Sequence, residues 1–336
     1  MTDEKTVERI AHTAASPEGE NSTYVLPDRG LVIDPGPPGD DSWDVLTTGL
    51  STTGLPVESV ETVVVTHWHA DHAGLAPRLV SASGAELVMH ENDAPLVADY
   101  TTERTRRIDR DARRLREWGV PDDIVTAVRA GDTPSPMPDE CPVTALTDGD
   151  SVGDVEVVHA PGHTAGHLAL DAGDSLFLGD AVLPMYTPNV GGTDTRMTNS
   201  LTTYLDTLDR LTERVEPGSV SPNAFPGHGS TVELTARIDV IRDHHAERVL
   251  NVLAELPGSE SDGRTPWSVA RSLFGEMQGI HAKMGAGEAS AHLEFAVARG
   301  LAEQVGDESD RYVRTDVAVP DFSDVLVDSE VHSRYR

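Results

Sequence analysis

The sequence contains one cysteine, Cys141, so no disulfide can form within the chain. Aromatic residues are scarce, at 4% of the 336 positions, and no apolar run is long enough to span a bilayer. Residues 1–15 carry charges and lack the apolar region of a secretory signal. These absences argue against a disulfide-stapled secreted domain and against a membrane protein. We therefore expect a soluble, cytoplasmic protein with no membrane partner.

Lysine is almost missing as well. Lys5 and Lys283 are the only lysines, and arginine supplies the rest of the 26 basic residues against 57 acidic ones, for a net charge of −31. Such a charge destabilises a compact chain by self-repulsion unless salt screens it. Because the acidic residues are spread along the whole sequence, we expect a halophilic protein of a high-salt cytoplasm. An acidic protein that binds a basic partner would gather its charge in one segment.

The length suggests about two domains, and the first two-thirds of the chain alternates strand and helix patterns. Strands are predicted over residues 23–26, 30–34, 62–66, 86–89, 152–159, 168–171, 175–178 and 220–225. Helices are predicted over residues 41–49, 75–81, 103–118, 122–129 and 200–215. Two β-rich halves interleaved with helices predict an α/β fold in which two sheets pack face to face with helices outside. This domain is expected to cover residues 1–235.

The remainder of the chain has a different pattern. A periodic helix over 238–256 connects to a Pro/Gly/Ser-rich linker over 257–263. Helices over 265–274 and 286–299 and a hairpin formed by 301–305 and 311–314 would follow. We expect a connecting helix over 236–256, a small winged-helix-like α/β module over 257–318, and an acidic, flexible tail over 319–336.

The densest group of metal-ligand residues is His-x-His-x-Asp-His, formed by His67, His69, Asp71 and His72. It follows the apolar run 63–65, which predicts a buried strand. Three imidazoles and one carboxylate suit zinc, or less selectively iron or manganese. Three imidazoles so close together would repel one another once protonated, so packing alone is a weak explanation for them.

Further His and Asp residues stand where predicted strands end, several of them beside glycine, which allows a sharp turn. These residues are Asp34, His163, His167, Asp180 and His228. Strand ends on one side of a pair of sheets can converge on a single point, as a site with several ligands requires. We expect His90, His159, His281 and His292 not to bind metal. His245 lies on the apolar face of the helix over 238–256 and is expected to be a core histidine, with the alternative that His244 and His245 reach the site.

Taken in order, these motifs resemble those of the metallo-β-lactamase superfamily over roughly residues 20–235. The resemblance implies an αββα sandwich with two Zn²⁺, or Fe or Mn, at one edge of the sheets. It implies His67, His69 and His163 as ligands of one metal, Asp71, His72 and His228 as ligands of the other, Asp180 as a bridge, and Asp34 in support. For His167, a role in supporting the ligands and a purely structural role stay open. Two close metals lower the pKa of a shared water, giving a bridging hydroxide that Asp71 orients as the catalytic residue. The implied reaction is hydrolysis of an ester, thioester, amide or phosphodiester.

The superfamily members differ in substrate. The zinc β-lactamases are secreted and usually use a cysteine ligand, which argues against antibiotic hydrolysis here. Glyoxalase II-like thioester hydrolases share all seven ligand types, but they hold glutathione with lysines and arginines. Residues 181–200 contain one basic residue, Arg196, and no lysine, which weakens this resemblance. The β-lactamase-like protein two group, with its Gly-His-Gly motif, long helix and winged-helix domain, resembles nearly the whole chain. That group implies cleavage of single-stranded RNA.

Several alternatives stay open. Residues 262–316 carry more acidic than basic side chains, whereas an RNA-binding winged helix is normally basic. Strong salt screens phosphate attraction and weakens that objection. The module could instead form a homodimer or cover the site. Seven arginines over 104–116 could meet an anionic substrate, or could pair with acidic residues of their own helix. A non-catalytic metal-binding scaffold is disfavoured because all seven ligand positions are filled.

Overall fold

The computed structural model of the chain describes residues 7–13, 19–215, 223–306, 310–319, 321 and 323–326. The chain forms two compact units. Unit 1 comprises Met1–Arg107, Thr133–Pro188 and Thr207–Arg237, and unit 2 comprises Ile108–Asp132, Asn189–Asp206 and Ile238–Arg336. The segments 108–132 and 189–206, which we placed with the first domain from the sequence, therefore group with unit 2. Most of the expected tail over 319–336 lies outside the described residues.

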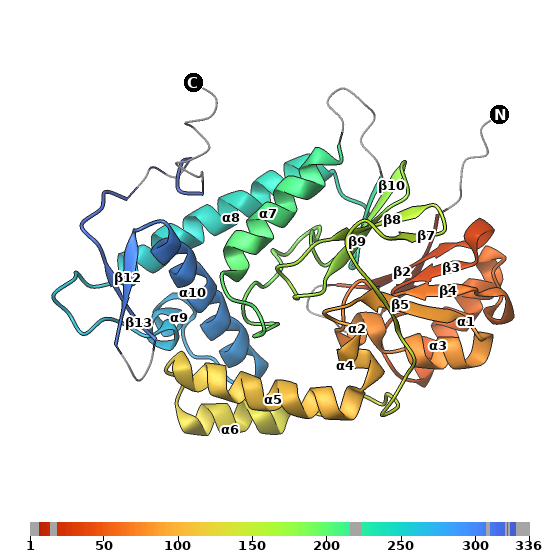
Figure 1. The fold of residues 1–336 in the computed structure, drawn as a ribbon, viewed down its shortest axis with the longest axis horizontal. Coiled ribbons are helices and arrows are strands. Elements are labelled where there is room, and N and C mark those ends of the chain that lie inside the picture. Colours follow the sequence, from red (N-terminus) through yellow and green to blue (C-terminus); the bar gives the residue numbers. More distant parts are fainter. Residues whose placement is uncertain are drawn as a thin grey trace. The chain divides into compact units, whose positions relative to one another are not determined.

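Unit 1 contains two sheets (Figure 1). The first has the order β1-β2-β3-β4-β5-β6 and the second the order β11-β10-β9-β8-β7. The strands of the first sheet are β1 (Glu8–His12), β2 (Asn21–Leu26), β3 (Leu31–Ile33), β4 (Thr62–Val64), β5 (Glu86–His90) and β6 (Thr144–Leu146). Those of the second are β7 (Ser151–Val152), β8 (Val155–His159), β9 (Leu168–Asp171), β10 (Ser175–Gly179) and β11 (Asn223–Pro226). Strands β1 and β6 were not expected from the sequence.

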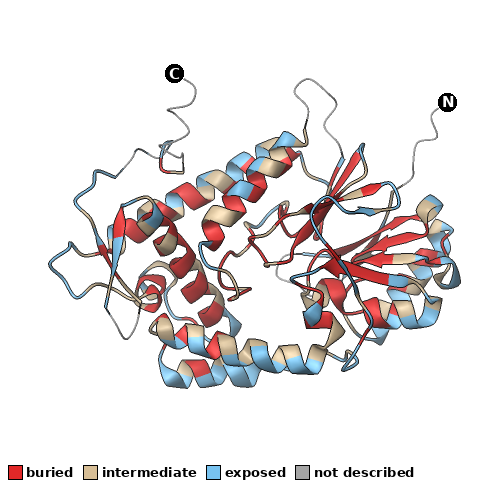
Figure 2. Ribbon diagram, viewed as in Figure 1, coloured by how far each residue is buried: buried red, intermediate tan, exposed pale blue. Residues whose placement is uncertain are grey.

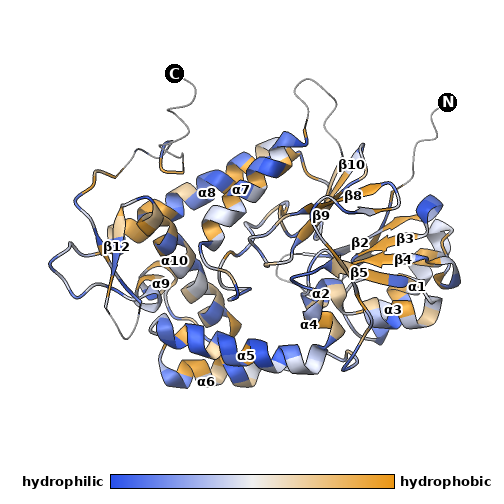
Figure 3. Cartoon of the chain, in the orientation of Figure 1, coloured by the Kyte–Doolittle hydropathy of each residue, from blue (hydrophilic) through white to orange (hydrophobic). Residues whose placement is uncertain are grey.

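Alternating side chains of the first sheet belong to two different cores. Leu26 and Ile33 face the second sheet, where they join Phe177 of β10. Their neighbours Val25 and Val32 face the opposite way and pack against helices. This period-two alternation of buried residues is what a sheet covered on both faces requires. The buried residues run along the strands of both sheets in Figure 2, and the same strands are hydrophobic in Figure 3.

Helices cover the outer faces of the sheets. Leu46 of α1 (Asp40–Thr53) and Leu79 of α3 (Ala76–Ser83) belong to the outer core of the first sheet (Figure 1). Along the second sheet, Arg210 of α7 (Ser200–Glu213) donates to the carbonyl of His159 at 2.8 Å. Short helices α2 (Ala70–Ala73) and α4 (Pro95–Ala98) and the 3-10 turns Pro27–Arg29 and Val57–Ser59 complete the connections. The expected αββα sandwich is thus confirmed.

Strand direction places the ligand-type residues at matching ends. Strands β3, β4, β5 and β6 run parallel to one another. In the second sheet β10 is parallel to β11, while β9 is antiparallel to both β8 and β10, so β8, β10 and β11 share one direction. The carboxyl ends of parallel strands meet at the same edge of a sheet. Each sheet therefore delivers its His- and Asp-bearing loops to one edge.

Unit 2 is mainly helical. Its elements are part of α5 (Tyr100–Glu117), α6 (Asp122–Gly131), α8 (Leu234–Glu255), α9 (Pro266–Phe274), α10 (Ile280–Ala298) and the hairpin β12 (Ala302–Val305) with β13 (Arg311–Arg314). Thr265 caps α9 by accepting from the Ser268 amide at 3.1 Å. The predicted hairpin is confirmed by the antiparallel register of β12 and β13. In the part of the chain that the structure describes, no helix combines the length and apolarity of a membrane span.

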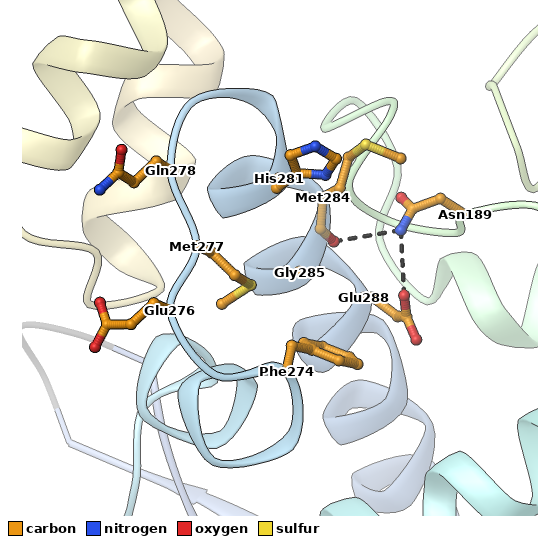
Figure 4. Close-up of a pocket in the computed structure, with 9 residues that line it drawn as sticks. All are labelled: Asn189, Phe274, Glu276, Met277, Gln278, His281, Met284, Gly285 and Glu288. Carbon is orange, nitrogen blue, oxygen red and sulfur yellow. Dashed lines mark hydrogen bonds between the residues drawn. The ribbon is translucent and has the colours of Figure 1, made fainter. Parts of the chain in front are cut away.

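Helix α10 begins earlier than the sequence predicted, at Ile280 instead of 286. The added turns contain Gly285, and glycine weakens a helix by about 1 kcal/mol relative to alanine, which hid the helical pattern. A side chain at Gly285 would collide with the sulfur of Met277. Figure 4 shows Met277 beside Gly285 at a pocket of about 630 Å³, with Asn189 donating to Met284 and Glu288. Close packing, not propensity, therefore explains the early start.

Candidate metal centre

Three imidazoles converge where β4 and β8 end. His69 Nδ1 lies 2.9 Å from His67 Nε2 and 3.1 Å from His163 Nε2. His67 and His163 are buried and His69 is half-buried. Burial and then the neighbouring His72 lower the pKa of His67 well below its usual value, and burial and then His163 lower the pKa of His69 to about 3. Neutral imidazoles are the form that binds a metal.

A second group forms at the start of α2 and the end of β11. His228 Nε2 lies 3.3 Å from His72 Nε2 and 3.4 Å from Asp71 Oδ2. The two imidazoles are fully buried, whereas the Asp71 side chain is 36% exposed. The open side of this group is therefore at Asp71, where a solvent molecule or a substrate can approach.

Asp180, which follows β10, stands between the two groups. Its Oδ2 is 3.4 Å from His228 Nε2 and 3.8 Å from His163 Nε2, and its Oδ1 is 3.4 Å from His72 Nε2. Among the described residues, Oδ1 accepts no hydrogen bond despite being buried. A buried carboxylate oxygen without a hydrogen bond is costly unless a cation faces it.

The carboxylates change the charge of the second group. Burial alone would lower the pKa of His72 and of His228. Asp180 and its neighbours outweigh burial, raising the pKa of His72 well above its usual value and that of His228 to about 9. In turn, His72 and His228 hold the pKa of Asp180 well below its usual value, although burial acts in the opposite direction. This part of the site therefore favours positive charge, from protons or from metal ions.

The donor set fits metal ions. His69 Nδ1 has a single in-plane position for a proton or a lone pair, so it cannot make good hydrogen bonds to both neighbouring nitrogens at once. Tetrahedral zinc with Zn–N bonds of ~2.0–2.1 Å separates its nitrogen ligands by roughly 3.3 Å. The observed separations near 3 Å are close to this value. Three sets of residues have ligand atoms within 4.8 Å of one another: His67, His69 and His163; His67, His72 and Asp180; Asp71, His72 and His228.

Asp34 supports the loop between β4 and α2. Its Oδ1 accepts from the Thr66 amide and its Oδ2 from the Thr66 hydroxyl, both at 2.7 Å. Oδ2 also lies 2.9 Å from His72 Nδ1, which leaves the Nε2 of that ring for the site. Asp34 has a φ of 51°, which is uncommon for a residue other than glycine. A carboxylate behind a ligand histidine fixes the ring and its tautomer.

His167 lies behind the ligand atoms. Its Nε2 accepts from the Asp180 amide at 2.9 Å, and its ring stacks on His67 with centroids 5.1 Å apart. Gly179, with a φ of 48°, makes this approach possible, because a Cβ there would lie 2.7 Å from His167 Nε2. Similarly, a Cβ at Gly227 would overlap Asp180 Oδ1. The backbone is therefore packed directly against the side chains that shape the site.

Two polar residues in contact with these loops were missed from the sequence. The fully buried Asp93 accepts from the Thr164 hydroxyl at 2.7 Å, the Gly166 amide at 2.9 Å and the Trp68 amide at 3.3 Å. It thus ties the loop of His67 to the loop of His163. Asn21 Nδ2 lies 3.2 Å from both Asp71 O and Asp71 Oδ2. Neither residue belongs to a local motif, so only the folded chain identifies them.

Histidines outside the predicted set make other contacts. His90 and His159 stack on each other with centroids 3.9 Å apart. His245 Nδ1 lies 3.1 Å from His292 Nε2 in unit 2. None of these four belongs to a metal-type group among the described residues, and neither does His281.

The sequence matches the metallo-beta-lactamase superfamily over residues 15–216, which is more than half of the chain. The chain belongs to this superfamily. It is 27% identical over 202 residues to the beta-lactamase-like protein 2 homolog of Drosophila melanogaster, covering 58% of this chain and 54% of that protein. It is 25% identical over 315 residues to the probable metallo-hydrolase YqjP of Bacillus subtilis, covering 88% of this chain and 94% of that protein.

Among solved structures, the metallo-beta-lactamase family protein TTHA1429 from Thermus thermophilus superposes with a TM-score of 0.72 at 26% identity. The match covers 92% of this chain and 98% of that one. A beta-lactamase domain protein from Burkholderia ambifaria gives a TM-score of 0.71 at 25% identity, covering 92% of this chain and 91% of that one. By contrast, the chain spans about half the length of the Drosophila protein. The likeness to the superfamily fold thus reaches beyond the two sheets into the helical segments.

Proposed function

We propose that the protein is a metal-dependent hydrolase with a two-metal centre, and that its substrate is single-stranded RNA. The observation that carries the two-metal proposal is the position of Asp180. Its two oxygens lie within 3.8 Å of nitrogens from both histidine groups. A carboxylate placed in this way is suited to bridge two cations.

In this proposal the first metal is held by His67, His69 and His163. The second is held by Asp71, His72 and His228, with Asp180 shared. Nitrogen ligands combined with carboxylate oxygens favour zinc, with iron or manganese as the alternatives. Two bound metals would lower the pKa of a water between them and polarise the bond under attack.

Asp71 is the residue we assign to the reacting water. Its carboxylate is partly exposed, whereas the imidazoles beside it are buried. Asn21 and His228 both contact its Oδ2, at 3.2 and 3.4 Å, which restricts its orientation. A carboxylate held at the open side of the site can accept a hydrogen bond from an incoming water and orient that water towards a substrate.

The loop after Asp180 supports RNA as the substrate. Met185 and Tyr186 are 78% and 51% exposed. Arg237 fixes this loop by donating to the carbonyls of Leu183 at 2.6 Å and Tyr186 at 2.8 Å. Pro184 of the same loop lies against Gly229, directly after His228. An exposed aromatic ring on this anchored loop offers a stacking surface for an unpaired base.

The glutathione thioester alternative has less support. Arg196 is the one basic residue of the segment 181–200, and its guanidinium is paired with Asp194 at 2.5 Å.

Arginines of α5 are candidates for contacts with an anionic backbone. Arg107 lies 5.1 Å from the ring of Trp68, next to His69. Some arginines of α5 pair along their own helix, as Arg106 does with Glu103 and Arg114 with Glu117.

The test is a paired assay in high salt on protein purified with its metals. We expect about two metals per chain by elemental analysis. We also expect cleavage of a labelled single-stranded RNA that Asp71→Ala abolishes. Turnover of S-lactoylglutathione without RNA cleavage would favour the thioester hydrolase. Full activity in protein free of metal would contradict the two-metal centre itself.

The role of the loop is tested separately through Tyr186. Loss of one stacked base costs about 1–3 kcal/mol. Tyr186→Ala should therefore raise the KM for RNA by roughly 5- to 150-fold and leave the metal content unchanged. Tyr186→Phe keeps the ring and should behave like the wild type. The matched control is Val240→Ala, which removes an equally exposed apolar side chain from α8. Equal KM values for Tyr186→Ala and Val240→Ala would rule out stacking.

A further inference from the structure

Unit 2 contains a small pocket of about 290 Å³ lined by residues of α5, α6 and the start of α10. Most of its wall is apolar, with Ala112 and Leu115 fully buried and Ile108, Val128 and Ile280 closer to the surface. Four charged residues, two of each sign, also line it: Asp111, Arg129, Asp132 and Lys283. The pocket in Figure 4 is larger and is lined by more polar side chains. The smaller pocket is therefore the better candidate for an apolar ligand.

A buried ion pair lies in this apolar wall. Lys283 and Asp111 are 4% and 5% exposed, and Lys283 Nζ donates to Asp111 Oδ2 at 2.7 Å. The other oxygen of Asp111 accepts from the Thr195 hydroxyl at 2.6 Å. The pair is neutral as a whole, and its carboxylate is well supplied with donors. Both members of the pair line the pocket.

The ammonium group is less completely used. It carries three N–H groups, and each needs an acceptor when buried. In the described part of the chain two acceptors are recorded, Asp111 and the carbonyl of Thr193, and the second is distant at 3.4 Å. Lys283 can therefore donate to one further acceptor on the pocket side.

The residue type fits this role. Arginine supplies 24 of the 26 basic residues, so a lysine here stands out. A guanidinium has five donors in a rigid fork and would need more acceptors, whereas an ammonium is compact and donates in any direction. Lysine thus provides a single donor at the end of an apolar pocket and leaves the volume of that pocket free.

We propose that this pocket binds a medium-length acyl group through its carbonyl oxygen, which accepts from Lys283 while the alkyl chain packs against α5 and α6. At ~30 Å³ per small group, the volume holds about ten non-hydrogen atoms. The neutral pair selects a neutral head group. A carboxylate or an ammonium head group would bring an additional charge into surroundings of low polarity where Lys283 and Asp111 already neutralise each other, and burying that charge is costly. This binding site is independent of the hydrolytic centre proposed above.

The test uses octanamide, which has about ten non-hydrogen atoms and so matches the pocket volume, against octanoate and octylamine of similar length. Calorimetry on the full-length, metal-loaded protein in high salt should show saturable binding of octanamide with one site per chain. Binding of octanoate and of octylamine should be at least tenfold weaker. Absence of saturable octanamide binding would overturn the site, and equal binding of octylamine would overturn the role of Lys283.

Variants separate the pocket from the rest of the surface. Ala112→Phe fills the pocket and keeps the ion pair, so it should weaken octanamide binding at least tenfold. Ile280→Lys changes a residue at the pocket, and Val240→Lys on α8 is its control. The two apolar side chains are similarly exposed, at 55% and 53%. The first should weaken binding at least tenfold and the second should not. Unchanged affinity in Ala112→Phe would refute the pocket as the site.

Lys283→Met on its own leaves Asp111 buried without its cation and is expected to destabilise the fold. The double variant Lys283→Met with Asp111→Asn removes both charges and should fold better. We expect the wild type to bind octanamide more tightly than nonane, and we expect the double variant to lose this preference. Retention of this preference in the folded double variant would exclude Lys283 as the donor. None of these measurements depends on hydrolysis, so the failure of one proposal leaves the other intact.

Discussion

Each unit of the protein buries a group of histidines, and the groups differ in what faces them. In unit 1 the imidazoles surround Asp180, whose oxygens lie within 3.8 Å of three of them. In unit 2, His292 Nδ1 lies 2.7 Å from the Glu288 carbonyl and donates to it. His292 Nε2 is then free to accept from His245 Nδ1, which lies 3.1 Å away. In that chain of hydrogen bonds each ring stays neutral.

The difference teaches what turns buried histidines into a cation site. Burial lowers the pKa of His292 to about 3, and the nearby Arg248 acts in the same direction. No carboxylate is among the described groups that shift this pKa. At His228 the carboxylate of Asp180 does reverse the effect of burial. In this protein, therefore, the imidazole group suited to cations is the one with a carboxylate among its rings, and the group without one forms a packed, hydrogen-bonded core.

The largest expected effect tests the ligands directly. His69→Ala removes the nitrogen on which the first group converges, so it should abolish hydrolysis and reduce the metal content from about two per chain to one or none. Elemental analysis and the activity assay give the readout. His281→Ala, an exposed histidine of unit 2, is the control and should keep both metals. Full metal content in His69→Ala would mean that the histidines of unit 1 are no more a metal site than His245 and His292 of unit 2.

The next effect tests Asp93, which lies outside the proposed ligand set. Asp93→Asn weakens the link between the loops of His67 and His163 and should reduce metal affinity by about 10- to 100-fold, as is typical for such supporting groups. Competition with a chelator measures this affinity. Asp40→Asn, at an exposed position, is the matched control. If Asp93→Asn lowered the Tm of the metal-free protein but not the metal affinity, Asp93 would serve stability alone.

The pH dependence tests the neutral histidines. The pKa of His12 and of His90 is lowered to about 4, mainly by burial, and that of His292 to about 3. The unfolded chain, with an ordinary histidine pKa near 6.5, binds more protons below about that pH. The contribution of these three histidines to the free energy of unfolding should therefore be constant above about pH 6.5 and should fall by a few kcal/mol as the pH drops towards about 4.

Thermal melts across this pH range give the readout. Among groups near His292, Arg248 and His244 oppose a charge on its ring and the Glu288 carbonyl favours one. His292→Gln removes one titrating group and should make the acid slope shallower. An unchanged slope would mean that His292 is already protonated in the folded protein, and the contrast between the two groups would fail.

The smallest effect concerns Cys141. Burial raises the pKa of its thiol, and its side chain packs in the outer core of the first sheet. Cys141→Ala should cost about 1 kcal/mol of stability, as for an ordinary buried side chain, and should leave the metal content unchanged. Loss of metal in this variant would show that a thiol, and not only carboxylates, completes the centre.

The sequence predicted the parts of the site that are local or carried by a motif. His67 to His72 form one short segment, and Asp34, His163, Asp180 and His228 could be recognised because each stands near a strand end. Asp93 could not be recognised, because its partners lie 25 to 73 positions away. The pairing of Lys283 with Asp111 across 172 positions was equally hidden. Contacts of this kind depend on how helices pack, which residue patterns alone do not determine.

The same reasoning explains the errors in the elements. Helix α10 was cut short because glycine masked its pattern, while tight packing made that glycine necessary. Strand β6 has three residues, two of them exposed, so it lacks the alternation that marks a longer strand. Long elements with a clear buried face, such as α8, were predicted to within a few residues.

Gly179 and Gly227 have a consequence for engineering this protein. Neither has a side chain to donate to a metal, yet a single methyl group at either position would displace His167 or Asp180. A mutational library that seeks new substrates should therefore keep both fixed, since most replacements there would eliminate activity before specificity could be sampled. The exposed pair Met185 and Tyr186 is a more permissive target. Adaptability in this chain thus lies only a few residues along the loop from Gly179, one of its least tolerant positions.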